Sequence, residues 1–162
     1  MAVILVAVCF LSAGILFAKK SMICAEQITA CVNLCNQVEE MILFRALLSD
    51  DIFKYICTSK TFSIFGFEYT NRGNDSSYED YICMKINTNR AICLEQEDRH
   101  RLTEFLSGIG SVSYEHVGVF CKQYRDYFQS RVLPVSEQCS RNKKMFSALG
   151  IYSATLAVIL FI

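Results

Sequence analysis

Charged residues are absent from both ends of this 162-residue chain. Residues 1–18 and 145–162 contain no Asp, Glu, Lys or Arg, and every charged side chain lies between Lys19 and Lys144. The 16 basic residues balance the 16 acidic ones, so the formal net charge is zero. The chain therefore lacks the cationic excess of a nucleic-acid-binding protein or of a polybasic membrane arm. We predict no nucleic-acid partner, and one small domain between two apolar ends.

Motifs for catalysis and metal binding are also missing. The chain has no Cys-x-x-Cys pair, no Gly-x-Ser-x-Gly elbow and only two histidines, His100 and His116. A zinc site needs ligands at such spacings, and a nucleophile needs a base within reach. Adjacent acidic pairs such as Glu39 and Glu40 point in different directions on a helix and are typical of solvated faces. We therefore predict no enzyme activity, no catalytic or metal site and no cofactor.

The N-terminal segment, residues 1–18, is typical of a secretory signal peptide. An apolar stretch is followed by small residues in Ser12-Ala13-Gly14, at the places that a cleavage site requires. An uncleaved anchor is the alternative, because about 17 apolar residues is the lower limit for a membrane-spanning helix. We predict that the segment is cleaved.

The C-terminal segment, residues 141–162, is predicted to hold the chain at a membrane. Its last 18 residues are uncharged and follow Lys143 and Lys144. A glycosylphosphatidylinositol signal has a small attachment residue, a polar spacer and a hydrophobic tail of about 10–20 residues. Ser140 and Asn142 are the candidate lipid-anchor residues. A transmembrane helix is the alternative, although basic residues normally follow such a helix on its cytoplasmic side.

Eight of the nine cysteines remain if residues 1–18, which include Cys9, are removed. An even number at this density is typical of a secreted, disulfide-bonded domain. The sequence does not select the pairing. The predicted disulfide cysteines are Cys24, Cys31, Cys35, Cys57, Cys83, Cys93, Cys121 and Cys139.

Asn74 begins an Asn-Asp-Ser sequon and is the predicted glycosylation site, which agrees with an exposed loop of a secreted protein.

Hydrophobic periodicity predicts an all-α fold, a bundle of four to six short helices stapled by four disulfides between residues 21 and 140. The clearest helix runs from Met22 to about Leu48. Its apolar residues recur every three or four positions and place three cysteines on one face. Further helical segments are predicted around residues 52–57, 79–86, 95–106 and 114–131. The helix around residues 79–86 is predicted to be capped by Ser76, and the last helix to end near Pro134.

Aromatic residues concentrate in residues 61–78, which we predict to form a strand-like loop. Its rings could form an exposed binding patch, or they could cover a small core from outside, the interpretation that we favour. The candidate binding residues are Phe62, Phe65, Phe67 and Tyr69.

The order of the cysteines supports a comparison with a known family. The relevant segments are Cys31-Val32-Asn33-Leu34-Cys35, Phe53 to Cys57, Cys83 to Cys93, Leu102 to Ile109, Phe120 to Arg125, and Cys139. Together they resemble the Cys-rich domain of nematode chondroitin proteoglycan 4-type proteins, over residues 24–139. The resemblance implies a secreted matrix or cell-surface protein without a catalytic site. It does not imply chondroitin on this chain, because the only Ser-Gly pair, Ser107-Gly108, lacks acidic neighbours.

These observations predict a non-enzymatic extracellular protein, either secreted or at the cell surface, that acts by binding while tethered to a membrane by its C-terminal segment. The expected partner is an extracellular protein or matrix component. A carrier of small hydrophobic ligands is one alternative, and it requires an internal apolar cavity. A secreted hydrolase is the other, and it requires His100 or His116 to be buried beside a nucleophile or a carboxylate.

Overall fold

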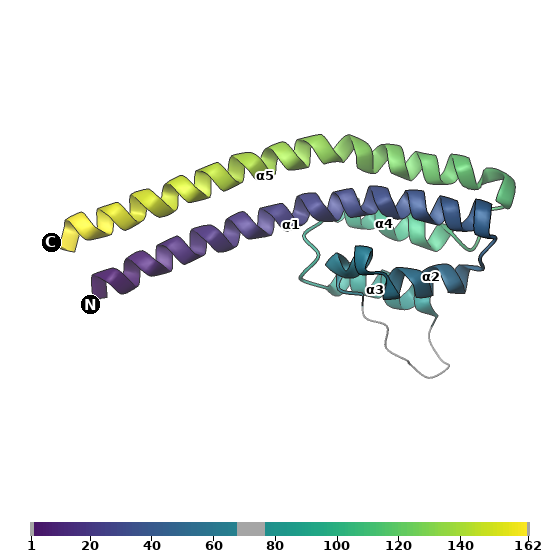
Figure 1. The fold of residues 1–162 in the computed structure, drawn as a ribbon, viewed down its shortest axis with the longest axis horizontal. Helices are drawn as coiled ribbons and strands as arrows, with labels where there is room; N and C mark the ends of the chain where they lie inside the picture. The colour runs from purple at the N-terminus through teal and green to yellow at the C-terminus, as the bar shows by residue number, and fades with distance from the viewer. Residues whose placement is uncertain (1, 68–76, 162) are drawn as a thin grey trace. The chain divides into compact units, whose positions relative to one another are not determined.

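The computed structural model describes residues 2–67 and 77–161, and in these residues all regular structure is helical (Figure 1). The elements in chain order are α1 (Ala2–Arg45), α2 (Ser49–Thr58), the 3-10 helix η1 (Lys60–Phe65), α3 (Tyr78–Thr88), α4 (Gln96–Gly108), the 3-10 helix η2 (Tyr114–His116) and α5 (Val117–Phe161). The prediction of an all-α fold is confirmed. The predicted disulfide staples are not seen, because no two described cysteines lie at disulfide-bonding distance.

The chain divides into two compact units. Unit 1 consists of residues 1–25 and 133–162, and unit 2 of residues 26–132. Within unit 1 the Cys139 thiol donates a hydrogen bond to the Ser21 carbonyl oxygen at 2.7 Å. Helices α1 and α5 run through the predicted boundaries at residues 18 and 140. The division into residues 1–18, 21–140 and 141–162 stays a prediction.

Unit 2 contains the hydrophobic core. The predicted stripe on α1 supplies one wall of this core, since Ile28, Cys31, Cys35 and Val38 are all buried. The largest buried side chains are phenylalanines from several elements: Phe53, Phe62, Phe65, Phe105 and Phe128. The stripe predicted from the spacing of apolar residues is therefore confirmed as the buried face of α1.

Two local predictions differ from the structure, one at η1 and one at the start of α3. Residues 60–65 form η1 rather than part of a strand-like loop, and η1 ends at Gly66, whose positive φ of 68° favours glycine. Helix α3 is capped by Ser77 rather than Ser76, because the Ser77 hydroxyl oxygen accepts a hydrogen bond from the Asp80 N–H at 3.1 Å. Two adjacent serines each precede an acidic residue by three positions, so the spacing alone could not distinguish them.

Helix α5 does not end near Pro134 but continues to Phe161. A proline inside a helix removes one backbone hydrogen bond and crowds the carbonyl group four residues earlier. Most of the residues on both sides of Pro134 are compatible with a helix, and each adds a hydrogen bond to a helix that has already formed. One missing bond is therefore not enough to end α5.

A buried glutamine joins three segments of unit 2. Gln27 on α1 is 0% exposed, and its side-chain amide donates hydrogen bonds to the carbonyl oxygens of Ile64 at 3.2 Å and Ala91 at 3.0 Å. Its side-chain oxygen accepts a hydrogen bond from the Cys93 N–H at 2.7 Å. Gln27 thus satisfies backbone groups of η1 and of the segment between α3 and α4, neither of which pairs in a sheet.

The C-terminal end of α4 packs against an aromatic cluster from α5. The Phe120 ring stacks on Phe105 with ring centroids 5.4 Å apart and meets Tyr124 edge-on at 5.1 Å. A Cβ atom at Gly108 would lie 2.5 Å from Cζ of Phe120, closer than van der Waals contact allows. Glycine at position 108 therefore allows this ring to approach α4.

Replacing Gly108 by alanine is expected to lower the free energy of unfolding by about 1–2 kcal/mol. Overpacking costs about 1–3 kcal/mol, which exceeds the gain in helix propensity of at most about 1 kcal/mol. Urea denaturation measures the change. Gly110→Ala is the matched control, because the nearest atom to its Cβ would be the Ser49 hydroxyl oxygen at 3.5 Å. Equal stability of the two variants would contradict the close approach of Phe120.

Candidate functional site

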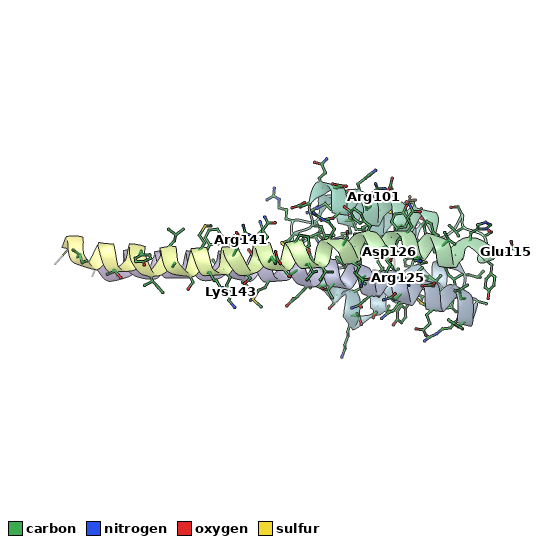
Figure 2. The ribbon with its side chains drawn as sticks, turned by 90° about the horizontal axis from the view of Figure 1, so that it is seen from above. Arg101, Glu115, Arg125, Asp126, Arg141 and Lys143 are labelled. Carbon is green, nitrogen blue, oxygen red and sulfur yellow. The ribbon has the colours of Figure 1, made fainter. Side chains whose placement is uncertain are left out.

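Ionisable side chains of unit 2 contact one another between helices α1, α4 and α5. We call this region the polar seam and define it by Glu39 and Asn36 on α1, Glu95 and Asp98 at the start of α4, and Arg125, Tyr127 and Arg131 on α5. Figure 2 shows the position of Arg125 along α5. Three buried cysteines, Cys31, Cys35 and Cys121, adjoin the seam.

Asp98 is the central residue of the α4–α5 half of the seam. Its side chain is 1% exposed, yet both carboxylate oxygens accept hydrogen bonds. The Tyr127 hydroxyl donates at 2.9 Å, and Arg131 donates from Nε at 3.1 Å and from Nη2 at 3.3 Å. Arg131 also donates to Glu95. The buried charge is therefore both paired and hydrogen-bonded, as burial of a carboxylate requires.

The electrostatics of this half of the seam keep Tyr127 and Arg131 protonated. Burial, together with the hydrogen bond to Asp98, raises the pKa of the Tyr127 phenol well above its usual value. The hydrogen bond to Asp98 raises the pKa of Arg131. Neither group can release a proton near neutral pH, so the arrangement suits a fixed clamp between α4 and α5 rather than acid–base chemistry.

The α1–α5 half of the seam is centred on Arg125. Its guanidinium donates hydrogen bonds to Glu39 Oε2 at 2.6 Å and to Asn36 Oδ1 at 3.0 Å. Cys35 and Cys121 lie one helical turn before Glu39 and Arg125 respectively and are fully buried. Burial raises the pKa of each thiol to about 12. At neutral pH both are protonated and poorly nucleophilic.

The two histidines lie outside the seam. His100 is 71% exposed and lies 3.3 Å from the Glu104 carboxylate. His116 is also exposed, and its Nδ1 is 2.9 Å from the Ser113 hydroxyl oxygen. A catalytic serine and histidine need a third group that orients the base, and a site that excludes water. Exposure of both histidines argues against the hydrolase alternative.

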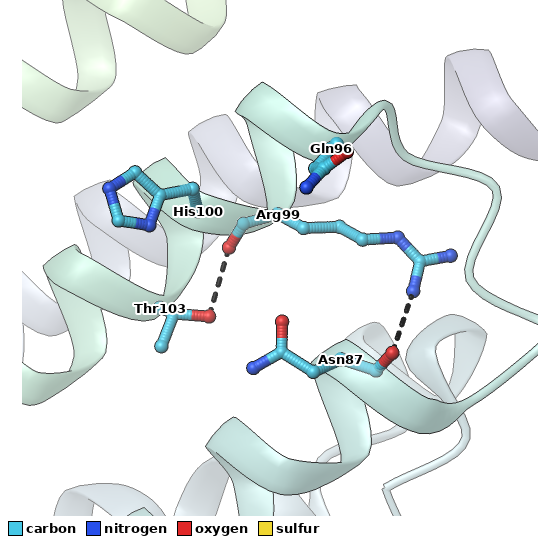
Figure 3. Close-up of a pocket in the computed structure, with 5 residues that line it drawn as sticks. All are labelled: Asn87, Gln96, Arg99, His100 and Thr103. Atoms are coloured by element: carbon cyan, nitrogen blue, oxygen red, sulfur yellow. Dashed lines mark hydrogen bonds between the residues drawn. The ribbon is translucent and has the colours of Figure 1, made fainter.

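An open cavity of about 460 Å³ lies between the end of α3 and the start of α4 (Figure 3). It is lined by Asn87, Gln96, Arg99, His100 and Thr103. The Arg99 guanidinium is already engaged, because it donates to the carbonyl oxygens of Ile86 at 2.8 Å and of Leu94 at 3.1 Å. The lining is polar, which does not suit the small hydrophobic ligand considered above.

The structure separates the other predicted site residues. Phe62, Phe65 and Phe67 are buried, with the last two rings stacked 5.4 Å apart, so these rings fill the core and do not form an exposed patch. Tyr69 and Asn74 lie outside the described residues. Ser140 and Asn142 lie within α5.

The predicted disulfide cysteines are also spread over several elements. Cys31, Cys35 and Cys121 lie together, Cys57 is buried on α2, and the Cys83 thiol lies 3.7 Å from the Ser107 hydroxyl oxygen. Their participation in disulfides stays a prediction.

Among the residues whose side chains the structure describes, which exclude most of residues 1–18 and 153–162, no helix is long and apolar enough to cross a membrane. The same part of the chain contains no group of three or more His, Cys, Asp or Glu side chains placed to hold a metal ion.

Sequence reasoning missed Gln27, Asp98 and Arg131. A signal for two of them was present, because Gln27 lies on the apolar stripe of α1 beside Ile28, and Asp98 lies four positions before Leu102 on the buried face of α4. A polar residue on an apolar stripe indicates a buried polar group that needs a partner. The partners themselves are distant in sequence and carry no local signature.

These features define a class: an all-helical protein whose buried polar groups are used in internal contacts rather than arranged around a reactive centre. The family model for stage III sporulation protein AB (spore_III_AB) matches residues 1–162. The chain belongs to this family. No curated protein and no solved structure matches it.

Family membership corrects the prediction of function and localisation. The resemblance to nematode chondroitin proteoglycan 4-type proteins is wrong. Also overturned are the extracellular surface or matrix role, the secreted or cell-surface localisation, the extracellular matrix partner, and the lipid-anchored glycoprotein. The resemblance depended mainly on cysteine order. Any helix with a cysteine-bearing apolar face produces spacings of three and four residues, so this order is weakly specific.

Proposed function

We propose that this chain acts in sporulation, at the stage that the description of its family names, as a non-catalytic structural component. The observation that carries the proposal is the match of the sporulation family over residues 1–162. A match over the whole chain includes both apolar ends and the helical unit 2, so no separate catalytic domain is needed to account for any part of it.

The non-catalytic part of the proposal is supported by the use of the polar groups. Asp98 and Arg131 are hydrogen-bonded to each other, and Arg99 donates to backbone carbonyl oxygens of its own unit. Burial raises the pKa of Cys35 and Cys121 to about 12, which keeps these thiols protonated. The charged side chains and thiols that could in principle take part in catalysis are thus engaged in internal contacts or buried in the fold.

We also propose that the helical unit is cross-linked by disulfides. The geometry that supports this is the grouping of cysteines from distant parts of the chain. In unit 1, Cys139 contacts Ser21 and Ala25, which lie on either side of Cys24 along α1. In unit 2, Cys35 on α1 and Cys121 on α5 adjoin the same Arg125. Cross-links at these places would join the beginning and the end of the chain.

The test of the proposal replaces the exposed polar groups that come closest to a catalytic arrangement. A strain that lacks the gene receives either the wild-type gene or the triple variant H100A/S113A/H116A. Because all three side chains are exposed, the variant is expected to fold and to restore the wild-type number of heat-resistant spores. Loss of spores with a normally folded triple variant would overturn the non-catalytic role.

A further inference from the structure

Three cysteines gather where α1 meets α5 in unit 2. Cys31 and Cys35 lie one turn apart on α1, Cys121 lies near the start of α5, and all three are 0% exposed. A buried thiol that acts only as a small apolar side chain needs no second sulfur beside it. The gathering of sulfur atoms from two distant helices therefore requires a separate explanation.

The contacts of Arg125 bring the relevant turns of the two helices together. Its guanidinium binds Asn36, the residue after Cys35, at 3.0 Å, and Glu39, one turn further along α1, at 2.6 Å. Arg125 itself lies one turn after Cys121. The turn that carries Cys35 is thus held against the turn that carries Cys121. Burial raises the pKa of the Cys35 thiol most, and the nearby Cys121 thiol raises it further, so the two thiols lie in the same neighbourhood.

We propose that Cys35 and Cys121 form a disulfide that joins α1 to α5, as one specific bond of the cross-linked fold proposed above. The oxidant is a small-molecule disulfide of the glutathione type. One protein thiolate attacks this disulfide and releases one small thiolate, leaving a mixed disulfide. The second protein thiolate then displaces the other small thiolate and closes the bond. The protein loses two electrons and two protons, and the small disulfide is reduced to two thiols.

Cys31 is the competing partner for Cys35. Both lie on α1 one turn apart, where Cβ atoms are about 5–6 Å apart, whereas a disulfide needs Cβ atoms about 3.5–4.5 Å apart. A bond within α1 would also constrain only one turn. The Cys35–Cys121 bond closes a loop that contains α2, α3 and α4, and long loops restrict the unfolded chain most.

Burial determines when the bond forms. In the folded chain both thiols are protonated and inaccessible, so exchange with a dissolved disulfide is slow. No two described cysteines lie at bonding distance in this structure, so a shift of side chains or of helix turns must accompany closure. The bond therefore forms while the helices are open, during folding or during a local opening, and is afterwards protected from reductant.

The experiment maps the bond in the full chain, refolded from urea in a buffer of reduced and oxidised glutathione. Remaining thiols are alkylated, and the non-reduced protein is digested with trypsin and analysed by mass spectrometry. Trypsin leaves Cys121 alone in residues 102–122, whereas Cys24, Cys31 and Cys35 share residues 21–45. The expected result is a linked pair of these two peptides, with fragment ions that assign the bond to Cys35.

Single variants provide the matched controls. Cys31→Ser is expected to retain the linked pair, whereas Cys35→Ser and Cys121→Ser are expected to lose it and to leave the remaining partner open to alkylation. Fragment ions from the wild-type chain assign the bond even if a variant does not fold. Alkylation of Cys121 in the refolded wild-type chain, or a bond from Cys121 to another cysteine, would overturn the pairing.

A failure of this pairing can be distinguished from a failure of the cross-linked fold and from a failure of the sporulation role. If Cys35 and Cys121 stay reduced while other cysteines are oxidised in pairs, the cross-linked fold stands and only this bond fails. If all nine cysteines of the full chain stay reduced, both fail. The sporulation role is measured by spore yield, which neither result changes. Reduction of the bond is expected to lower the urea midpoint of the wild-type chain but not that of C35S/C121S. An equal fall in both would also count against the pairing.

Discussion

Replacing Asp98 by alanine is expected to lower the free energy of unfolding by about 3–5 kcal/mol, the usual cost of removing one partner from a buried ion pair. The variant leaves the Arg131 guanidinium beside a cavity, with only the exposed Glu95 as an acidic partner, and removes the acceptor of the Tyr127 hydroxyl. The penalty comes mainly from these uncompensated groups and not from the loss of the attraction itself. Urea denaturation monitored by circular dichroism measures it.

Glu95→Ala is the matched control for this prediction. Glu95 binds the same arginine as Asp98, but its side chain is 61% exposed, whereas that of Asp98 is 1% exposed. An exposed ion pair contributes about 1 kcal/mol or less, so this variant is expected to be close to wild type. If the two variants lost similar amounts of stability, burial of Asp98 would not be what makes the clamp strong.

The second large effect is expected for Gln27→Leu, at about 3 kcal/mol of lost stability. Leucine has nearly the volume of glutamine, so packing changes little. The carbonyl oxygens of Ile64 and Ala91 and the N–H of Cys93 lose their side-chain partner, however. Each unsatisfied buried group costs about 1–3 kcal/mol, and the greater apolarity of leucine offsets part of this.

Hydrogen exchange distinguishes this mechanism from a general loss of packing. In Gln27→Leu, the Cys93 amide is expected to exchange faster by a larger factor than amides in the middle of α4, because the Cys93 N–H donates its hydrogen bond to the Gln27 side-chain oxygen. The control is Gln123→Leu on the exposed face of α5, which is expected to change stability by less than about 0.5 kcal/mol. Uniform acceleration of all amides would contradict the role of Gln27 as a local connector.

Much of the fold could be predicted from the sequence, because it depends on local patterns. The three- and four-residue spacing of Ile28, Cys31 and Cys35 predicts both a helix and its buried face, and both are found. The helical segment predicted around residues 52–57 is found as α2, although α2 begins earlier, at Ser49. A prediction from a single residue failed at Pro134. Proline usually ends a helix, but α5 continues through it because the residues on both sides are compatible with a helix.

The polar seam could not be predicted in the same way. The partners of Asp98 are 29 and 33 positions away, and those of Gln27 are 37 to 66 positions away. Only the folded arrangement shows which distant group meets a buried polar residue. The sequence shows that such residues lie on apolar faces, but it does not show which groups they meet. The function was mispredicted for a related reason, because cysteine spacing reflects helix geometry as much as ancestry.

The central claim is that this chain is a structural member of the stage III sporulation protein AB family. The most direct measurement is the spore yield, together with the developmental stage reached by microscopy, after deletion of the gene in the organism that encodes it. The account predicts cells that stop at stage III and form few heat-resistant spores, with the defect reversed by the wild-type gene. Normal progress through stage III and a wild-type spore yield in the deletion strain would contradict it.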